Sequence, residues 1–377
     1  MMGQGLLTSA YVHFPWCLKK CPYCDFASAA VERAEVRDQE YADALIAELA
    51  SRDVGGRRLG SVFFGGGTPS LWAASALGRT LHAIREAFDS SGELEVTVEC
   101  NPTSIDAEQA RALREVGVNR LSIGVQSLDN ENLRFLGRLH DAAGALTALR
   151  GARTEMERVS SDLMFGMPGQ GPDAFAGEID QILETGVEHV SAYALTIEPD
   201  TRFGALHRTG RLQLAPEEDF ADTFNRARAV FGDAGFEHYE VSNYARAGRT
   251  SQHNQHYWRG EDYLGLGAGA VGAMGGRRYR NDPRPSRYLE RPGASEVFEE
   301  TLGPDDQVRE ALMLGLRTAE GVDVEAVEAR TGLAVAEGRE AAIERRTQTG
   351  DLVIEGSHWR VPGDRWLHLD AIVTDLF

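Results

Sequence analysis

The chain has 377 residues, of which 42% are hydrophobic and 26% are charged, as is ordinary for a water-soluble globular protein. Its formal net charge of −19 argues against nucleic acid as a partner, because phosphate binding needs a basic surface. No stretch approaches the ~20 apolar residues of a membrane span, and the first residues lack the pattern of a signal peptide, so we expect a cytoplasmic protein.

Strand-like runs alternate with helical runs through the first two thirds of the chain. The predicted strands are Ala10–Phe14, Ser61–Phe64, Glu95–Glu99, Arg120–Val125, Val159–Phe165 and His189–Ile197. The predicted helices, whose apolar residues recur at helical spacing, are Tyr41–Arg52, Leu71–Phe88, Ala107–Val116, Ala142–Glu155 and Ala174–Thr185. This alternation is typical of βαβ units around a parallel sheet, in a barrel or a doubly wound fold. A distinctive cluster follows each strand, and barrel active sites lie at that end of the strands, so we favour an incomplete barrel.

The character of the chain changes after residue 290. A turn-rich, acidic stretch reads as a connector, and three helical runs, a hairpin with its turn at Gly356 and a last helix follow it. This is the outline of a winged-helix domain, and its many acids and lack of lysine argue against DNA binding. We therefore predict a barrel domain over residues 1–290 and a small winged-helix-like α+β domain over residues 300–377.

Three cysteines, Cys17, Cys21 and Cys24, lie close together after the first predicted strand. In a reducing compartment such crowding indicates metal or redox chemistry rather than a disulfide. The set fits zinc with one further ligand, or a [4Fe–4S] cluster with one iron left open. The only two lysines of the chain, Lys19 and Lys20, lie between the first two cysteines, where positive charge favours thiolates or an acidic docking partner.

A triple glycine followed by Thr68 and Pro69 comes directly after the second predicted strand. Glycines let the backbone approach a ligand closely, with amide N–H groups free to bind its oxygens. The alternative is a tight strand–helix turn with no ligand.

The cysteine spacing and the glycine turn together resemble radical S-adenosylmethionine (SAM) proteins. The resemblance is closest to the branch that contains oxygen-independent coproporphyrinogen III oxidase, and it covers nearly the whole chain. The motifs that carry it are YVHFPWC, GGGTPS, the turn from Glu99 to Pro102, SIGVQS, DLMFGMPGQ and AYALTIEP. It implies a partial (β/α)6-type barrel, a [4Fe–4S] cluster on the three cysteines, SAM on the open iron, and an electron donor such as a flavodoxin or ferredoxin.

The same resemblance implies which residues contact the cofactors. Those near the cluster and its SAM are Tyr11, Tyr23, Gly66, Gly67, Thr68 and Glu99. Those that match a second SAM site of the oxidase branch are Gln126, Arg138, Asp162 and Ala194. For Gln126 and Asp162 the alternative is a cap or a hydrogen bond at the barrel rim, although a buried carboxylate without a partner is costly.

Phe26 separates this chain from the oxidase. The oxidase has a further cysteine at this position, whereas the related heme chaperones have phenylalanine. The oxidase also typically has a longer arm before its first strand, which is predicted here to begin at Ala10.

A second stretch, from Ser251 to Trp258, matches the His-Asn-x-x-Tyr-Trp pattern that is implicated in heme binding by those chaperones. It lies in a region near residues 238–260, where we predict His253, ahead of His256, as an iron ligand and Tyr257 and Trp258 as porphyrin contacts. Nearby arginines that suit heme propionates are Arg246, Arg249 and Arg259. The alternative is that His253 and Trp258 only pack at a domain seam.

Two functions of different classes remain. One is a carrier that binds heme and hands it to an acceptor heme protein, such as a respiratory one. The other is an enzyme of porphyrin biosynthesis that oxidatively decarboxylates coproporphyrinogen III. A radical SAM methyltransferase is a third, weaker option, and the sequence leaves open whether the protein is an enzyme.

Overall fold

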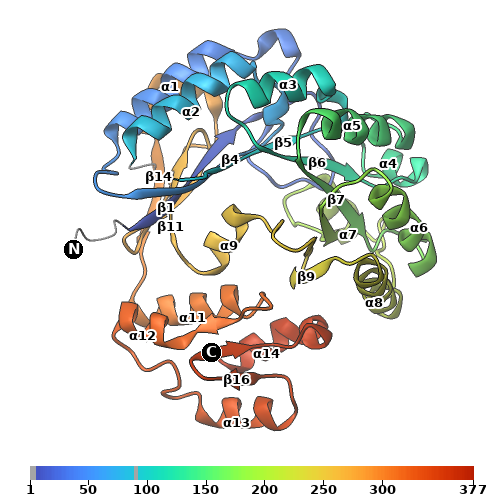
Figure 1. Cartoon of the computed structure of the whole chain (residues 1–377), viewed down its shortest axis with the longest axis vertical. Coiled ribbons are helices and arrows are strands. Elements are labelled where there is room, and N and C mark those ends of the chain that lie inside the picture. Colours follow the sequence, from blue (N-terminus) through green and yellow to red (C-terminus); the bar gives the residue numbers. More distant parts are fainter. Residues whose placement is uncertain (1–5, 89–91) are drawn as a thin grey trace.

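The structure is a computed structural model, and it describes residues 6–88 and 92–377. Six parallel strands follow one another in the sheet in chain order, as the sequence predicts. They are β1 (Leu7–Phe14), β4 (Arg58–Gly66), β5 (Glu95–Cys100), β6 (Arg120–Gln126), β7 (Arg158–Phe165) and β8 (His189–Ala194). The helices that cover their outer side are α1 (Asp38–Ser51), α2 (Ala74–Ala87), α3 (Ala107–Glu115), α4 (Asn130–Phe135), α5 (Ala142–Glu155) and α6 (Pro172–Leu183) (Figure 1). The predicted β/α alternation is confirmed.

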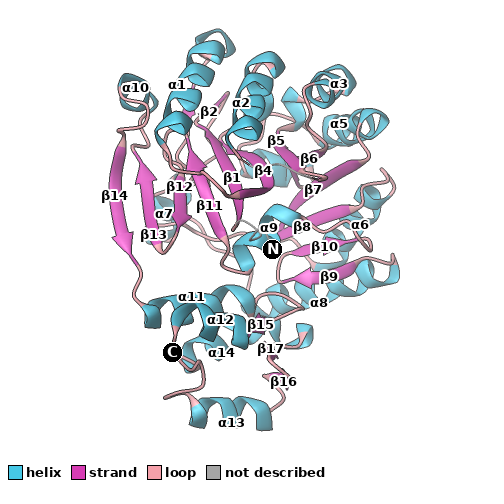
Figure 2. Ribbon diagram, turned by 60° about the vertical axis from the view of Figure 1, so that its left-hand side comes forward, coloured by secondary structure: helices cyan, strands magenta, loops and turns pink. Residues whose placement is uncertain are grey.

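Further strands, which the sequence did not reveal, extend both edges of this sheet. A hairpin of β9 (Glu237–Glu240) and β10 (Asn243–Ala245) joins β8 after α7 (Arg202–Arg208) and α8 (Glu217–Asp233). On the other edge, β11 (Asp262–Leu266) pairs parallel to β1, and an antiparallel series follows it: β12 (Val271–Met274), β13 (Arg277–Asn281) and β14 (Glu296–Thr301). Strands β14 and β9 are the two ends of the sheet, so the barrel is partial, as Figure 2 shows.

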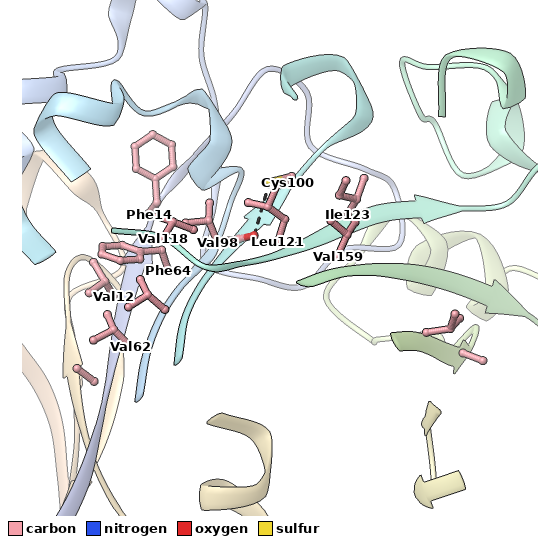
Figure 3. Close-up of a cluster of buried hydrophobic side chains, with 14 of the residues drawn as sticks. Val12, Phe14, Val62, Phe64, Val98, Cys100, Val118, Leu121, Ile123 and Val159 are labelled. Carbon is pink, nitrogen blue, oxygen red and sulfur yellow. Dashed lines mark hydrogen bonds between the residues drawn. The ribbon is translucent and has the colours of Figure 1, made fainter. Parts of the chain in front are cut away.

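The outer face of the parallel strands is apolar. Alternate residues point to this side, and Val12, Phe14, Val62, Phe64 and Val98 on it are fully buried under the helices (Figure 3). Because side chains alternate along a strand, one face can be aliphatic while the other carries polar groups. The outer face supplies the main hydrophobic contribution to stability.

The inner face is polar, unlike the aliphatic interior of a closed (β/α)8 barrel. The same strands direct Glu95, Glu99, Arg120 and Asp162 inward, together with several serines. Burial of so many polar side chains costs free energy unless they form hydrogen bonds or ion pairs with one another or with a ligand. This face therefore marks the interior of the partial barrel as the place for a site.

The connector expected after residue 290 is partly wrong, because β14 belongs to the main sheet, where it pairs with β13. A C-terminal unit follows, of α11 (Pro304–Gly315), β15 (Val322–Asp323), α12 (Val324–Thr331), α13 (Glu340–Gln348), β16 (Val353–Glu355), β17 (His358–Arg360) and α14 (Leu369–Asp375). Its three helices and its hairpin follow the predicted order, and it lies on the open side of the barrel (Figure 1). No helix in the described ranges is long and apolar enough to cross a membrane.

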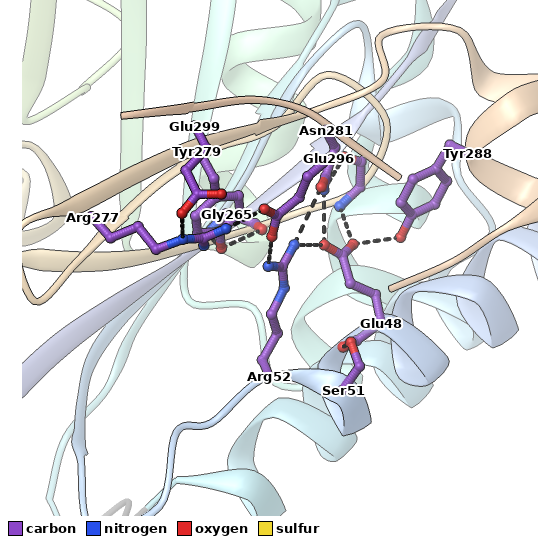
Figure 4. A network of polar contacts seen from close by, with 11 residues as sticks. Glu48, Ser51, Arg52, Gly265, Arg277, Tyr279, Asn281, Tyr288, Glu296 and Glu299 are labelled. Atoms are coloured by element: carbon purple, nitrogen blue, oxygen red, sulfur yellow. Dashed lines mark hydrogen bonds and ion pairs between the residues drawn. The ribbon is translucent and has the colours of Figure 1, made fainter. Parts of the chain in front are cut away.

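A buried polar network ties α1 to the added strands (Figure 4). The carboxylate of Glu48, which is fully buried, accepts hydrogen bonds from Arg52 at 2.6 Å, Asn281 at 2.8 Å, the Tyr288 hydroxyl at 2.7 Å and the Gly267 amide at 2.9 Å. Since nearly every acceptor position of this carboxylate is satisfied, the network fixes the loop after β11.

Candidate functional site

The cysteine loop is held at its base by backbone hydrogen bonds. Strand β2 (Trp16–Cys17) pairs with β3 (Ala29–Ala30), and the Val31 amide donates to the Cys17 carbonyl at 2.9 Å. The Lys20 ammonium donates to the Phe26 carbonyl at 2.8 Å and closes the loop from inside. The loop follows directly after β1 and lies at the C-terminal edge of the sheet, where the active sites of parallel barrels lie.

The three thiols of this loop line one cavity with the glycine turn and the ends of β5 to β8, which we call the cluster cavity. It measures about 370 Å³. Burial raises the pKa of Cys17, and it raises the pKa of Cys24 to about 11. The guanidinium of Arg138 donates a long hydrogen bond of 3.7 Å to the Cys21 sulfur.

The donor set fits an iron–sulfur cluster. No group of three or more His, Cys, Asp or Glu side chains within residues 6–88 and 92–377 is arranged to hold a single metal ion. One tetrahedral ion would draw its sulfur ligands within about 4 Å of one another. A [4Fe–4S] cube instead binds each thiolate to a different iron, so its ligands stand farther apart. Three cysteines on the wall of one cavity suit the cube.

The glycine turn is required by packing. Gly66 has a φ of +104°, and a Cβ there would lie 2.5 Å from the His13 ring. A Cβ on Gly67 would lie 2.5 Å from the Trp16 carbonyl oxygen and 2.8 Å from that of Phe14. Gly66 is favoured by its positive φ and the buried His13 ring, and Gly67 by neighbouring backbone that cannot move aside.

The amide groups of this turn are not free, so that part of the prediction is wrong. The Gly66 amide donates to Glu99 at 3.0 Å, the Gly67 amide to the Phe14 carbonyl at 2.7 Å, and the Thr68 amide to the Trp16 carbonyl at 2.8 Å. What the turn can still offer a ligand is carbonyl oxygen, which suits an ammonium group rather than a carboxylate.

Two acids face each other across the inner strands. Burial, and then the nearby charge of Asp162, raise the pKa of Glu99 to about 8. Burial also raises the pKa of Asp162, against hydrogen bonds from Ser191 and Ser122, the latter at 3.1 Å. Two neighbouring buried acids favour a cationic ligand, because a positive charge stabilises the ionised form of both.

Replacing Glu99 by glutamine should change how the stability of the ligand-free protein depends on pH. The folded-state pKa of about 8 lies above the ordinary carboxyl value of 4.5. The contribution of protonated Glu99 to the free energy of unfolding is therefore complete below pH 4.5 and is lost as the pH rises toward 8. We expect wild type to lose stability relative to Glu99→Gln over this interval, by at most about 1.4 kcal/mol per pH unit. Urea unfolding of both proteins at several pH values measures this difference, and a constant difference would contradict it.

Gln126 is the only non-glycine residue with a positive φ among the residues that the structure describes, and its φ is +71°. It ends β6 at a bulge against β7 and lines the cluster cavity. Arg138 reaches the same wall, where it donates to the Gly124 carbonyl at 2.5 Å, and its buried Nε has no hydrogen-bond partner among the residues that the structure describes. Strain and an unpaired guanidinium nitrogen on one wall are features typical of a binding site.

The structure brings most of the predicted cofactor residues together. All of them line the cluster cavity except Tyr11: Cys17, Cys21, Cys24, Tyr23, Gly66, Gly67, Thr68, Glu99, Gln126, Arg138, Asp162 and Ala194. Tyr11 lies deeper, where its hydroxyl donates to His13 Nδ1 at 3.0 Å. It lines a second cavity of about 420 Å³ inside the barrel, the lumen cavity, which shares Phe26, Gly66, Glu99 and Asp162 with the first.

The predicted heme ligand His253 lies on α9 (Gln252–Trp258), at the N-terminal ends of the strands, and lines the lumen cavity. Its ring is buried against Phe63, with 4.9 Å between centroids. Nδ1 lies 2.7 Å from the Ser61 hydroxyl and Nε2 lies 2.9 Å from the Tyr257 hydroxyl, so both ring nitrogens have partners. His256 is likewise bonded to Ser9, and burial lowers its pKa to about 4. In this structure both histidines hold α9 in place.

The other predicted heme contacts divide into two groups. Tyr257 and Trp258 line a third space of about 500 Å³, which we call the seam pocket because it lies between β11–β13 and the C-terminal unit. Arg246, Arg249 and Arg259 do not line it, since they contact Phe236, Glu157 and Glu320 respectively.

Two further contributors were not among the predicted site residues. Tyr193 of β8 lines both inner cavities, and alternation along that predicted strand could have identified it. The glycine-rich loop after β11 lies against the cysteine loop, because a Cβ on Gly269 would come within 2.7 Å of Ala27 and one on Gly267 within 2.5 Å of the His13 carbonyl oxygen. Its glycines allow this close approach.

Comparison with known proteins places this arrangement in a family. The description "Radical SAM superfamily" matches residues 11–182, and "HemN C-terminal domain" matches residues 302–364. The chain is similar over its full length to the solved structure of coproporphyrinogen III oxidase (HemN) from Escherichia coli, with a TM-score of 0.83, 22% identity, and coverage of 99% of this chain and 90% of that one. At that identity the likeness establishes the fold.

Sequence relatives are nearer. The chain is 33% identical to "Heme chaperone HemW" of Haemophilus influenzae over 97% of its own length and 96% of that protein, and 36% identical to the one of Bacillus subtilis, over 84% and 85%. It is 39% identical to the mouse mitochondrial "Radical S-adenosyl methionine domain-containing protein 1" over 81% of this chain and 67% of that protein. With these relatives, the radical SAM match and the cysteine loop at the C-terminal edge of a partial barrel, the chain belongs to the HemW family of radical SAM proteins.

Proposed function

We propose that this protein is a heme chaperone, which binds heme and transfers it to an acceptor heme protein. The observation that carries the proposal is the match to proteins named heme chaperone over nearly the whole length of both chains. The exposed Phe26 at the mouth of the cluster cavity, where the oxidase has a cysteine, supports it. The four free cysteines fit the cytoplasmic location that we propose with it.

In this proposal Cys17, Cys21 and Cys24 hold a [4Fe–4S] cluster, and SAM is the exchangeable ligand of the fourth iron. When bound, this pair would supply one-electron reduction of SAM. The carbonyl oxygens of the glycine turn and the carboxylate of Glu99 would orient the SAM ammonium group, and Tyr23 would pack on its adenine. Gln126, Arg138, Asp162 and Ala194, which line the same cavity, remain proposed contacts of a second SAM.

The test uses one anaerobically reconstituted preparation for two assays, a heme titration and coproporphyrinogen III turnover. We expect saturable heme uptake without porphyrin product, followed by transfer to an apo heme protein. Turnover that yields a porphyrin product would contradict the chaperone function and indicate the oxidase function instead. Absence of saturable heme uptake would remove the proposed function.

An acidic electron donor is a further part of the proposal. Beside the cysteine loop lies an open depression lined by more basic than acidic groups, although the whole chain carries a charge of −19. Its basic members are Lys19, Lys20, Arg134, Arg202, Arg211 and Arg280, against Asp25, Glu198 and Asp200. Such local complementarity steers an acidic protein, such as a flavodoxin or ferredoxin, to the mouth of the cluster cavity.

Reversing two of these charges, Lys19→Glu with Arg202→Glu, should slow reduction of the cluster by an acidic flavodoxin about tenfold at low salt, because electrostatic steering sets the association rate. The difference should shrink as ionic strength rises. Stopped-flow bleaching of the cluster absorbance measures the rate, with dithionite as a reductant that needs no docking. The control is Arg150→Glu on the outer surface of α5, and an equal loss in this variant would contradict a local docking site.

A further inference from the structure

The seam pocket is a built cavity that the cluster chemistry does not use. Its walls include residues of β11 to β13, the end of α9, and one face of α11, together with Tyr11 and His13 of β1. That face of α11 consists of Gln307, Glu310, Ala311 and Leu314, which lie on one side of the helix because they are three or four residues apart. At about 500 Å³ the pocket lies within the ~300–1,000 Å³ range of small-molecule sites.

The lining of this pocket combines aromatic and aliphatic side chains with charged ones, among them the acids Glu261, Asp262 and Glu310. Trp258 and Tyr257 come from α9, Tyr263 from β11, and Leu302 and Leu314 from the C-terminal side. At the rim, the exposed Arg330 donates to the Gly260 carbonyl at 3.2 Å and has no ion pair within the described residues. An aromatic cleft with one unneutralised guanidinium at its edge suits a flat apolar ligand that carries a carboxylate.

The pocket adjoins the lumen cavity inside the barrel. It shares Tyr11, His13, Tyr257, Gly269 and Val271 with the lumen cavity, which in turn meets the cluster cavity. A ligand in the seam pocket would therefore have its inner edge directed along this row of cavities toward the cluster.

The donors that face the pocket differ in whether they are free. Tyr11 and His13 are bonded to each other, His13 also donates to the Ala27 carbonyl at 2.9 Å, and the Tyr257 hydroxyl is bonded to His253. Tyr263 is different: its hydroxyl has no hydrogen bond among the described residues, and its ring contacts Tyr257 edge-on at 4.6 Å between centroids. Its strand partner Ala273 lies beside it on the same wall of the pocket. Ala273 is half-buried, and its small side chain leaves space for a ligand next to Tyr263.

We propose that the seam pocket is the heme seat of this protein, with Tyr263 as the axial ligand of ferric iron and Arg330 at a propionate. The proposal rests on the proposed function and departs from the histidine ligand that the sequence suggests. A phenolate is an established ligand of heme iron. On coordination the phenol proton passes to water, and the iron stays ferric. The C-terminal unit then has a direct role, since α11 forms one wall of the seat.

The test is a set of ferric heme titrations followed by absorbance. Wild type is titrated first, and if it shows no saturable uptake, the proposed function itself fails. If wild type binds, Ala273→Trp should weaken heme binding at least tenfold, because the indole fills the seat beside Tyr263. The matched control is Met313→Trp, which adds an indole to α11 at a side chain that is 44% exposed, and it should bind as wild type does.

The ligand is tested by spectrum. Tyr263→Phe should lose the phenolate-to-iron charge-transfer band while the cluster absorbance, measured in the same sample, stays unchanged. Arg330→Glu, at the exposed rim, should weaken binding severalfold without changing the band. The proposal is overturned if Tyr263→Phe keeps the wild-type heme spectrum, or if Ala273→Trp with an intact cluster binds heme as tightly as wild type. A spectral change in His253→Ala alone would return the ligand to that histidine.

Discussion

Cys21→Ser is expected to lose the iron–sulfur absorbance of the reconstituted protein together with most of its bound iron and sulfide. Cys21 lies in the middle of the cysteine loop, on the wall of the cluster cavity and next to the guanidinium of Arg138. A serine hydroxyl ionises far less readily than a thiol and is a poor partner for iron. Since changes of groups that only support a metal ligand already weaken metal affinity about 10–100-fold, loss of the ligand should cost at least as much.

The control for this experiment is the fourth cysteine. Cys100 is buried at the end of β5, where it also borders the cluster cavity, but it lies outside the cysteine loop and its thiol donates to the Val98 carbonyl oxygen at 3.5 Å (Figure 3). We expect Cys100→Ala to keep a full cluster. Retention of the cluster in Cys21→Ser, or tightly bound zinc in wild type, would contradict the proposed iron–sulfur site.

Gly67→Ala is expected to destabilise the protein by about 3 kcal/mol and to displace the start of the cysteine loop. The new Cβ would stand 2.5 Å from the Trp16 carbonyl oxygen and 2.8 Å from that of Phe14. The same two carbonyls accept the amides of Thr68 and Gly67, so the clash cannot be relieved without losing hydrogen bonds. Because Trp16 directly precedes Cys17, we expect cluster content to fall with stability.

Gly177→Ala is the matched control. Gly177 lies within α6 and has nothing within 4 Å of a built Cβ, so alanine there should stabilise by about 0.5–1 kcal/mol through its helix propensity. Urea unfolding and iron content of both variants provide the comparison. A Gly67→Ala protein with wild-type stability and a full cluster would show that the turn is looser than its contacts indicate.

Local patterns explain which parts of the fold were predictable. The parallel strands between β1 and β8 carry short apolar runs with period two, which a local pattern can show. Helix α5 was predicted with its observed bounds, because its Asp141 cap and the spacing of its apolar residues both lie within the helix or next to it in the sequence. Strand β11 was not found. Its sequence is short and merges into a run of glycine and alanine, and it becomes a strand by pairing with β1, which is more than 250 residues away in the chain.

The site was predictable to a similar degree. Residue types and spacing identified the cysteine loop and the polar strand ends, and strand alternation implies that they meet at one edge. Which hydrogen bonds each group makes was not predictable from spacing. The glycine amides were expected to be free, but they donate hydrogen bonds within the protein. The role of His253 follows from its contacts with Ser61 and Tyr257 rather than from its motif.

The sequence by itself determined the parallel β/α order, the three thiols on one loop and the acidic character of the chain, because these follow from periodicity, spacing and composition. The tertiary structure alone decided which side chains remain available for ligands. Packing of α9 under the strands takes up both nitrogens of His253, and packing of the C-terminal unit against β11–β13 leaves a cavity in which the Tyr263 hydroxyl has no partner among the described residues. The physical reason is that hydrogen-bond satisfaction and cavity shape depend on contacts between distant segments, which no local pattern contains.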